Sequence, residues 1–299
     1  MNMNKRFFIL GLLIAGLASS SCENELQEEM VTGLMEKTPL SIQVAAGQVE
    51  DASTKALVEG NSLPVGSEIG LRVVQAGKST YDGTTYENVK SSFDGTKWNV
   101  ASDVLLSATP GTVYAYYPWK SGVNLTAVPL SSSGEDFMYA AGQAVDNKHP
   151  SASLTMNHVM AEVTVILENK DYVGTGTVTG LTWSSASASN SGMLNATNGL
   201  ISASDPGSVL DAGLSGTNTQ SIYTSTRYSF LVVPTKTNAA PTFNITMDGY
   251  SYSATGGEVE LKSGVRYTYK LMMKGTTLIV GNVTVENWGN SDQGILNPS

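Results

Sequence analysis

The one cysteine of this sequence, Cys22, lies directly behind a segment with the layout of an export signal. Lys5 and Arg6 form a short positive region, and Phe7 to Leu17 is an apolar run followed by small residues. The run is shorter than the roughly 20 apolar residues that a membrane-spanning helix needs. We therefore expect residues 1–21 to be removed as a signal peptide, which places the Cys22 thiol beside a new amino terminus.

The chemistry that this placement favours is lipidation. Residues 17–21, Leu-Ala-Ser-Ser-Ser, resemble a bacterial lipobox, although its small residues are serines more than alanine and glycine. The Cys22 sulfur would carry diacylglycerol and the new amino terminus an acyl chain, and stable anchoring needs more than one chain. Lipidation leaves no thiol for a disulfide or for catalysis within the chain. The alternative is a general secretory signal that merely ends near a cysteine.

Residues 22–39 are expected to be a solvated tether, because they are acidic and show no apolar periodicity before Leu40. Acidic residues just after a lipidated cysteine resemble an export signal to the outer cell surface in bacteria of the Bacteroides type.

Without Lys5 and Arg6, the chain has 15 basic and 26 acidic side chains. This balance argues against nucleic acid as a partner, because such binding depends largely on lysine and arginine that neutralise phosphates.

The second position that could undergo chemistry is Lys55, which lies among small residues in the sequence Ser-Thr-Lys-Ala. A trypsin-like protease would cut between Lys55 and Ala56. Before this point, Leu40, Ile42 and Val44 alternate with polar or small residues, which predicts a β-strand with one buried face. Cleavage would let the strand and the anchor leave together, and a hydrophobic slot would remain. On the residues alone, a resident first strand and an ordinary surface lysine are favoured.

The two histidines, His149 and His158, lack the neighbours that metal binding or acid-base catalysis requires. The sequence has no His-Glu-x-x-His, no Gly-x-Ser-x-Gly and no pair of cysteines. Residues 77–79, Gly-Lys-Ser, lack the earlier glycine of a phosphate-binding loop. We therefore expect structural histidines, no catalytic residue, no metal, no cofactor and no enzymatic activity.

Strand patterns at short spacing fill the sequence after residue 40, and turn pairs such as Asp248-Gly249 indicate hairpins. The longest pattern, Leu154 to Leu167, changes its apolar face in the middle, which requires a bulge or a passage from one sheet to another. The polar segment Ser184 to Ser191 is expected to be an exposed loop. A boundary after the long pattern predicts all-β domains over residues 40–169 and 170–299.

The C-terminal part predicts one or two further strands through Leu278, Val280, Val283 and Val285. Such a segment either completes a sheet of its own chain, which is usual, or fills a groove in a neighbouring molecule as a donor strand.

Seven stretches, in order over nearly the whole mature chain, carry a family resemblance: Ser53 to Ala56, Gly66 to Leu71, Val113 to Pro118, Glu135 to Ala140, Leu154 to Met160, Leu261 to Tyr267 and Val283 to Trp288. Together with the lipobox they resemble the fimbrillin family, the Mfa-like type V pilin lipoproteins of Bacteroidales. The resemblance implies two consecutive β-sandwich domains of transthyretin-like topology. It also implies export as an outer-membrane lipoprotein at the cell surface.

In function, the resemblance implies cleavage by a trypsin-like protease and polymerisation with other pilin subunits by strand exchange. The product is a fimbria that serves adhesion to a host or bacterial surface receptor. Arginine is common at the cleavage position in the family, so Lys55 calls for a protease that tolerates lysine. A second function stays open: a surface lipoprotein that never polymerises and presents the segment Ser184 to Ser191, or Trp98, Trp119 and Trp183, to glycans.

Overall fold

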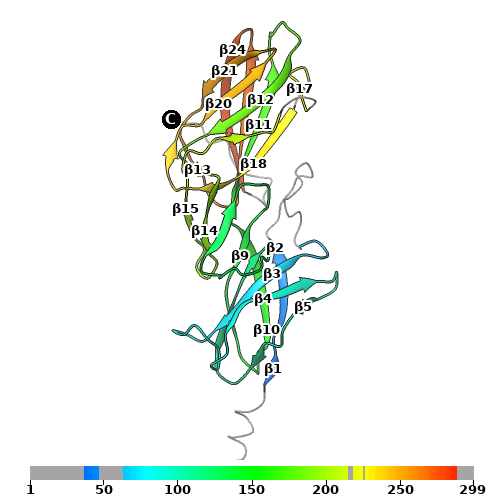
Figure 1. The fold of residues 1–299 in the computed structure, drawn as a ribbon, viewed down its shortest axis with the longest axis vertical. Helices are drawn as coiled ribbons and strands as arrows, with labels where there is room; N and C mark the ends of the chain where they lie inside the picture. Colours follow the sequence, from blue (N-terminus) through cyan, green and yellow to red (C-terminus); the bar gives the residue numbers. More distant parts are fainter. Residues whose placement is uncertain (1–36, 47–62, 215–217, 225, 288–299) are drawn as a thin grey trace, which may run out of the picture. The chain divides into compact units, whose positions relative to one another are not determined.

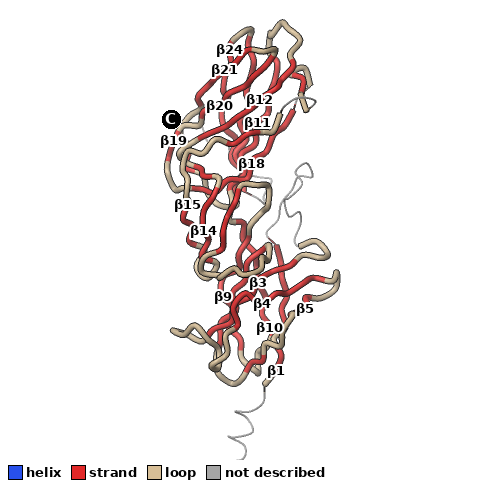
Figure 2. Tube along the Cα trace, in the orientation of Figure 1, coloured by secondary structure: helices blue, strands red, loops and turns tan. Residues whose placement is uncertain are grey.

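The expected all-β fold is confirmed by a computed structural model, which describes residues 37–46, 63–214, 218–224 and 226–287. Over these ranges every regular element is a β-strand, as Figure 2 shows. In the same ranges, no helix is long and apolar enough to cross a membrane.

The first sheet contains seven strands in the order β2-β10-β9-β7-β3-β4-β5 (Figure 1). Its neighbours are antiparallel except β2 and β10, which run parallel. In chain order the strands are β2 (Ser41–Ala46), β3 (Glu68–Val74), β4 (Tyr86–Phe93), β5 (Trp98–Val100), β7 (Gly111–Tyr117), β9 (Met138–Val145) and β10 (Ser151–His158). A separate antiparallel pair consists of β1 (Thr38–Pro39) and β6 (Leu105–Leu106).

Two five-stranded sheets follow from residue 161 onward and pack around one core. The first has the order β13-β18-β11-β23-β24; it comprises β11 (Ala161–Asn169), β13 (Ala188–Ser189), β18 (Thr226–Pro234), β23 (Val265–Lys274) and β24 (Thr277–Asn287). The second has the order β16-β12-β20-β21, and β17 also pairs with β12; it comprises β12 (Thr177–Ser184), β16 (Leu210–Asp211), β17 (Gln220–Ser221), β20 (Thr242–Met247) and β21 (Tyr250–Thr255). The remaining pair is β19 (Asn238–Ala239) with β22 (Val259–Glu260).

A three-stranded sheet joins the earlier and later parts of the chain. It consists of β8 (Val128–Ser131), β14 (Ser191–Asn195) and β15 (Leu200–Ala203), with β14 in the middle. Its buried residues share a core with Val159 and Met160, which link β10 to β11, and with Leu231 and Val233 of β18. Strands that are far apart in the sequence are therefore hydrogen-bonded to each other at this junction.

The change of apolar face between Leu154 and Leu167 is a passage from one sheet to another, as the sequence pattern allows. Leu154 on β10 is buried in the core of the seven-stranded sheet, whereas Val163 and Leu167 on β11 belong to the core of the later sheets. Strand β11 pairs with β18 and β23. Residues 161–169 therefore lie in the later sheets, although the predicted boundary assigns them to the earlier domain. The division into two domains stays a prediction.

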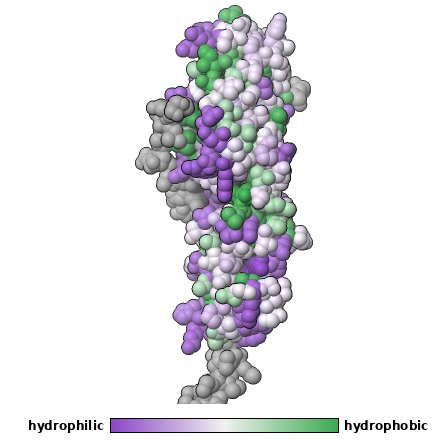
Figure 3. All heavy atoms as spheres, turned by 90° about the vertical axis from the view of Figure 1, so that its left-hand side faces the viewer, coloured by the Kyte–Doolittle hydropathy of each residue, from purple (hydrophilic) through white to green (hydrophobic). Residues whose placement is uncertain are grey.

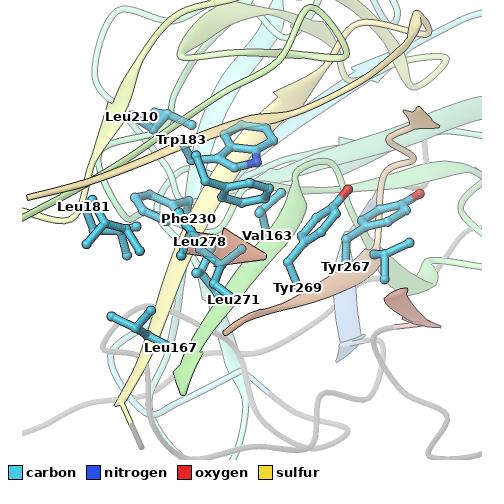
Figure 4. Packing of buried hydrophobic residues seen from close by; sticks show 14 of the residues in the cluster. Val163, Leu167, Leu181, Trp183, Leu210, Phe230, Tyr267, Tyr269, Leu271 and Leu278 are labelled. Carbon is cyan, nitrogen blue, oxygen red and sulfur yellow. The ribbon is translucent and has the colours of Figure 1, made fainter. Parts of the chain in front are cut away.

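The core of the later sheets is rich in large side chains (Figure 4). Trp183 and Phe243 are fully buried, and the ring of Phe243 lies 5.1 Å from that of Tyr269. Burial in this apolar setting raises the pKa of the Tyr269 hydroxyl well above its usual range. Aromatic residues bury large areas, so this core is expected to contribute much of the stability of the later sheets.

The turn between β20 and β21 has positive φ at both central residues, 50° at Asp248 and 81° at Gly249. These angles fit the primed hairpin turn that the Asp-Gly pair predicts. The Asp248 carboxylate accepts hydrogen bonds from the Tyr172 hydroxyl (2.7 Å) and from the amides of Gly176 and Thr177 (2.8 Å each). The Tyr172 hydroxyl and these amides hold the pKa of Asp248 below its usual range. The hairpin tip is thereby tied to the connection between β11 and β12.

The expectation of an exposed loop from Ser184 to Ser191 is wrong. Ser185, Ser187 and Ser189 are all buried, and β13 within the segment pairs with β18. The hydroxyls of Ser185 and Ser187 bond to each other at 2.8 Å, and Ser189 donates to the carbonyl of Ser191 at 2.7 Å. Small hydroxyl side chains can be buried when such partners satisfy them, which a polar composition does not reveal.

One buried ion pair joins the neighbouring strands β11 and β23. Arg266 Nε lies 2.5 Å from Glu162 Oε2, and the two side chains are 9% and 1% exposed. The two residues are direct partners in the parallel register. Such a pair is costly to break on one side, because the remaining charge stays buried.

We expect Arg266→Met to lower the free energy of unfolding by about 3–5 kcal/mol, because it removes a positive charge that lies beside the buried Glu162 carboxylate. Lys270→Met is the matched control, since Lys270 on the same strand faces Glu168 at 3.9 Å in an exposed pair. Its effect should not exceed about 1 kcal/mol. Urea unfolding of both variants measures the difference, and equal losses would contradict the structural role of the buried pair.

Candidate strand-exchange site

The first ladder strand, β2, lies at one edge of the seven-stranded sheet. It pairs in parallel with β10 from Ser41 opposite Ser151 to Ala46 opposite Met156. Strand β5, at the other edge of the sheet, comes near β2, but the two are not hydrogen-bonded neighbours in the described part of the chain. The sheet therefore curls without closing, and β2 is held by a backbone ladder along one side.

The side chains of this strand alternate as the sequence predicts. Leu40 and Ile42 are 7% and 6% exposed and belong to the core of the seven-stranded sheet. Val44 is half-buried and packs against the same core, whereas Ser41 and Gln43 are exposed. Removal of the strand would uncover the apolar surface that Leu40, Ile42 and Val44 now cover.

The start of the strand has further attachments that the sequence analysis missed. The amide of Leu40 donates to the carbonyl of Val104 at 2.9 Å, and the Thr38 hydroxyl donates to the carbonyl of Asn147 at 3.1 Å. Strand β1 also pairs with β6 next to these bonds. These contacts join residues more than 60 positions apart, so periodicity within one segment could not indicate them.

The predicted donor residues lie on β24, which is one continuous strand and pairs with β23 in antiparallel orientation. Leu278 and Val283 are buried, and Val280 and Val285 pack against the core of the later sheets. Strand β24 is at the edge of its sheet. Within one molecule it completes the chain's own sheet, and a donor role stays a prediction.

Three predicted site residues, Cys22, Lys55 and Ala56, lie outside the described residues. Lipidation at Cys22 and cleavage after Lys55 therefore stay predictions.

Each of the two histidines lies beside an aspartate. His158 is buried and its Nδ1 lies 2.8 Å from Oδ2 of the buried Asp136, whereas His149 is exposed and its Nδ1 lies 3.0 Å from Asp146 Oδ1. Asp136 directly precedes the apolar sequence that leads into β9, and a single sequence gave no signal for its pairing with His158. Among the described residues, no group of three or more histidine, cysteine, aspartate or glutamate side chains is arranged to hold a metal ion.

The three tryptophans in the described part of the chain, Trp98, Trp119 and Trp183, do not form an exposed aromatic platform. Trp183 is fully buried in the core, because β12 points it inward together with Leu181 (Figure 4). The expectation that Trp183 is presented to glycans is therefore wrong. Trp98 is half-buried and stacks on Phe93 at 5.3 Å between ring centroids, and Lys90 Nζ lies 4.9 Å from the ring centroid of Trp119.

On the face drawn in Figure 3, hydrophobic residues lie in separate patches among hydrophilic ones. The described residues on this face therefore offer no extensive apolar surface for contact with another molecule. Such a surface is expected instead from the side chains that β2 covers.

Comparisons with known proteins support the family and the fold. The profile of the family described as fimbrillin-like matches residues 54–288, which is most of the chain. The curated proteins give no match. Three similar crystal structures are of candidate cell adhesion proteins, and at 13–16% identity what they show for this chain is the fold.

The first, from Bacteroides ovatus, has a TM-score of 0.64 and 16% identity, over 86% of this chain and 100% of the other. The second, from Bacteroides uniformis, has a TM-score of 0.62 and 16% identity, over 84% and 99%. The third, from Parabacteroides distasonis, has a TM-score of 0.53 and 13% identity, over 86% and 98%. These structures share the β-sandwich fold over nearly their whole length. Because the family profile covers most of the sequence, the chain belongs to the fimbrillin-like family.

Proposed function

We propose that this chain is a fimbrial adhesion subunit of the cell surface that is anchored through Cys22, cleaved after Lys55 and polymerised by exchange of its first strand. Membership of the fimbrillin-like family supports the fimbrial role, and the similar structures named as candidate adhesion proteins support the adhesive one. The observation that carries the exchange step is the position of β2, an edge strand with a ladder along one side.

The free energy that holds β2 in place is of a size that a strand from another molecule can supply. Burial of Leu40 and Ile42 contributes about 1.5–3 kcal/mol for each side chain, and each ladder hydrogen bond adds about 0.5–1.5 kcal/mol. Together these contributions are of the same order as the total free energy of unfolding of a typical domain, about 5–15 kcal/mol. The strand is therefore firmly bound while it is part of the chain, and it is replaceable once the chain is cut.

The connection between β2 and β3 includes Lys55. Cleavage after Lys55 would remove the covalent link between the first strand and the remaining sheet, and only β10, β6 and the core contacts would retain it. Loss of the strand would leave β10 as an unpaired edge beside an apolar slot. An edge of this kind favours addition of a strand from another molecule.

The donor in this proposal is the C-terminal segment of a second copy, beginning in β24. Val283 and Val285 repeat the alternation of Ile42 and Val44, so they could fill the same kind of slot. Strand β24 lies at a sheet edge, so its release would leave the interior strands of its own sheet paired. The fibre would then grow by the same contact between each pair of neighbours.

The alternative of a glycan-binding lipoprotein that never polymerises loses part of its support. The segment Ser184 to Ser191 is largely buried, and Trp183 lies in the core. We therefore prefer the fimbrial subunit.

A first prediction concerns the attachment of the strand. Ile42→Ala should lower the free energy of unfolding by about 2–5 kcal/mol, because it removes a buried aliphatic side chain. Gln43→Ala is the matched control on the exposed face of the same strand, and it should stay within about 0.5 kcal/mol of the unsubstituted chain. Denaturant unfolding measures both, and an unchanged stability of Ile42→Ala would show that β2 does not cover the core.

A second prediction tests exchange itself. Limited trypsin treatment of the purified chain should produce a fragment that begins at Ala56 and forms assemblies larger than a monomer in size-exclusion chromatography. Lys55→Gln should prevent this cut and the assembly. An excess of a synthetic peptide covering residues 38–46 should block assembly by refilling the slot, whereas the same peptide with Ile42→Asp should not. A cut fragment that loses its first strand and stays monomeric would contradict the proposal.

A further inference from the structure

A surface hollow of about 230 Å³ lies on the face of the seven-stranded sheet that is turned away from its main core. Its lining includes Arg72, Lys78, Thr112, Tyr114, Thr126 and Thr197, and no lining residue is a carboxylate. These residues come from β3, the turn after it, β7, the segment before β8 and the turn between β14 and β15. Five chain segments thus build one polar hollow on a protein whose net charge is −9.

The floor of the hollow is fixed by pairing of β3 with β7. Arg72 lies directly opposite Tyr114, and Val74 lies opposite Thr112, so their side chains share one face. Gly142 on the adjoining β9 leaves room for this arrangement. A Cβ atom at Gly142 would lie 2.6 Å from Thr112 Cγ2 and 2.7 Å from Tyr114 Cε1. The Thr112 and Tyr114 side chains therefore occupy space that a side chain at position 142 would take.

Lys78 is held in place by a short chain of hydrogen bonds. The side-chain nitrogen of Gln75, Nε2, donates to Asp82 Oδ1 at 3.1 Å. The side-chain oxygen of Gln75, Oε1, accepts from Lys78 Nζ at 3.1 Å. The ammonium group has three donors, so two more can face a ligand. Within the described residues, no carboxylate lies at ion-pair distance from Lys78 Nζ.

Arg72 supplies the second cation of the hollow. Its Nε lies 3.2 Å from Glu87 Oε2 but makes no hydrogen bond with it. The guanidinium group has five donors in a planar fork, and this contact leaves the terminal nitrogen atoms for a further acceptor. Glu87 offsets part of the charge of Arg72, which leaves Lys78 as the main source of positive potential in the hollow.

Two threonine hydroxyls that line the hollow each donate a hydrogen bond to a nearby asparagine side chain. Thr126 Oγ1 donates to Asn124 Oδ1 at 2.8 Å, and Thr197 Oγ1 donates to Asn195 Oδ1 at 2.6 Å. Because each hydroxyl proton is used on the asparagine, the lone pairs of each oxygen remain free to accept a hydrogen bond. A ligand beside these hydroxyls is therefore expected to offer hydroxyl donors.

We propose that this hollow binds one acidic monosaccharide unit, a sugar ring that carries a carboxylate. The carboxylate pairs with Lys78 and Arg72, the ring hydroxyls donate to Thr126 and Thr197, and the half-buried Tyr114 ring packs against the apolar face of the sugar. The volume lies below the roughly 300 Å³ at which pockets for drug-sized ligands begin, which suits a single ring. A simple anion would leave the hydroxyls and the aromatic ring unused.

This inference is independent of strand exchange, because none of its groups belongs to β2 or β24. It gives an adhesion subunit a place for sugar contact whether or not it polymerises. The test is therefore made on the uncut monomer, so that its failure leaves the fimbrial proposal unaffected.

The uncut chain is titrated with glucuronate, glucose and acetate, and binding is followed by ligand-detected NMR. We expect saturable binding of glucuronate with a dissociation constant at least tenfold lower than those for glucose and acetate. Equal binding of glucose would show that the cations do not take part. Equal binding of acetate would show that the hollow recognises only the carboxylate. Either result, or the absence of saturation with glucuronate, overturns the proposal.

Variants locate the binding. Lys78→Ala should weaken glucuronate binding at least tenfold, and Lys97→Ala, an exposed lysine in another glycine-containing turn, should leave it unchanged. Thr126→Val and Thr197→Val should each weaken it at least threefold while the thermal midpoint, measured in parallel, stays the same. Binding by Lys78→Ala as tight as that of the unsubstituted chain would overturn the assignment of the site.

Discussion

The one-sided attachment of the first strand is the constraint on which the rest of this structure depends. Strand β2 reaches β10 across more than a hundred residues of sequence and pairs with it in parallel, while its apolar side chains complete the core of the seven-stranded sheet. A strand in the middle of a sheet is held by two ladders and is lost only when the sheet unfolds. An edge strand is held by one ladder and by burial, and both can be supplied equally well by another chain.

The interior strands of the described residues have more pairing partners than β2 and β24 have. Strands β10 and β11 run directly from the first sheet into the later ones, β8 pairs with β14 across the junction, and Glu162 is joined to Arg266 within the sheet. By contrast, β2 and β24 both lie at sheet edges. The proposed exchange would therefore replace segments at sheet edges and leave the interior contacts unchanged, which is what repeated addition of identical units requires.

Local sequence patterns predicted the features that depend on neighbouring residues. The alternation of Leu40, Ile42 and Val44, the change of apolar face after Leu154 and the Asp248-Gly249 turn each follow from backbone period or turn chemistry. Features that depend on distant pairing were not predictable in this way. They include the parallel partner of β2, the buried pair of Asp136 and His158, the burial of the serine-rich segment and the hollow formed by five segments. A polar composition indicates exposure on average, and only the fold decides which hydroxyls find partners inside.

Native-state hydrogen exchange tests the central claim most directly, because it measures the free energy of opening for each strand separately. If β2 is a replaceable edge strand, the β2 amide hydrogens that are bonded to β10 will exchange through a local opening. The free energy of that opening will be smaller than the one measured for the central strand β11. If the β2 amides and the β11 amides exchange only together, with the same free energy as global unfolding, the first strand is an inseparable part of the sheet and the account is contradicted.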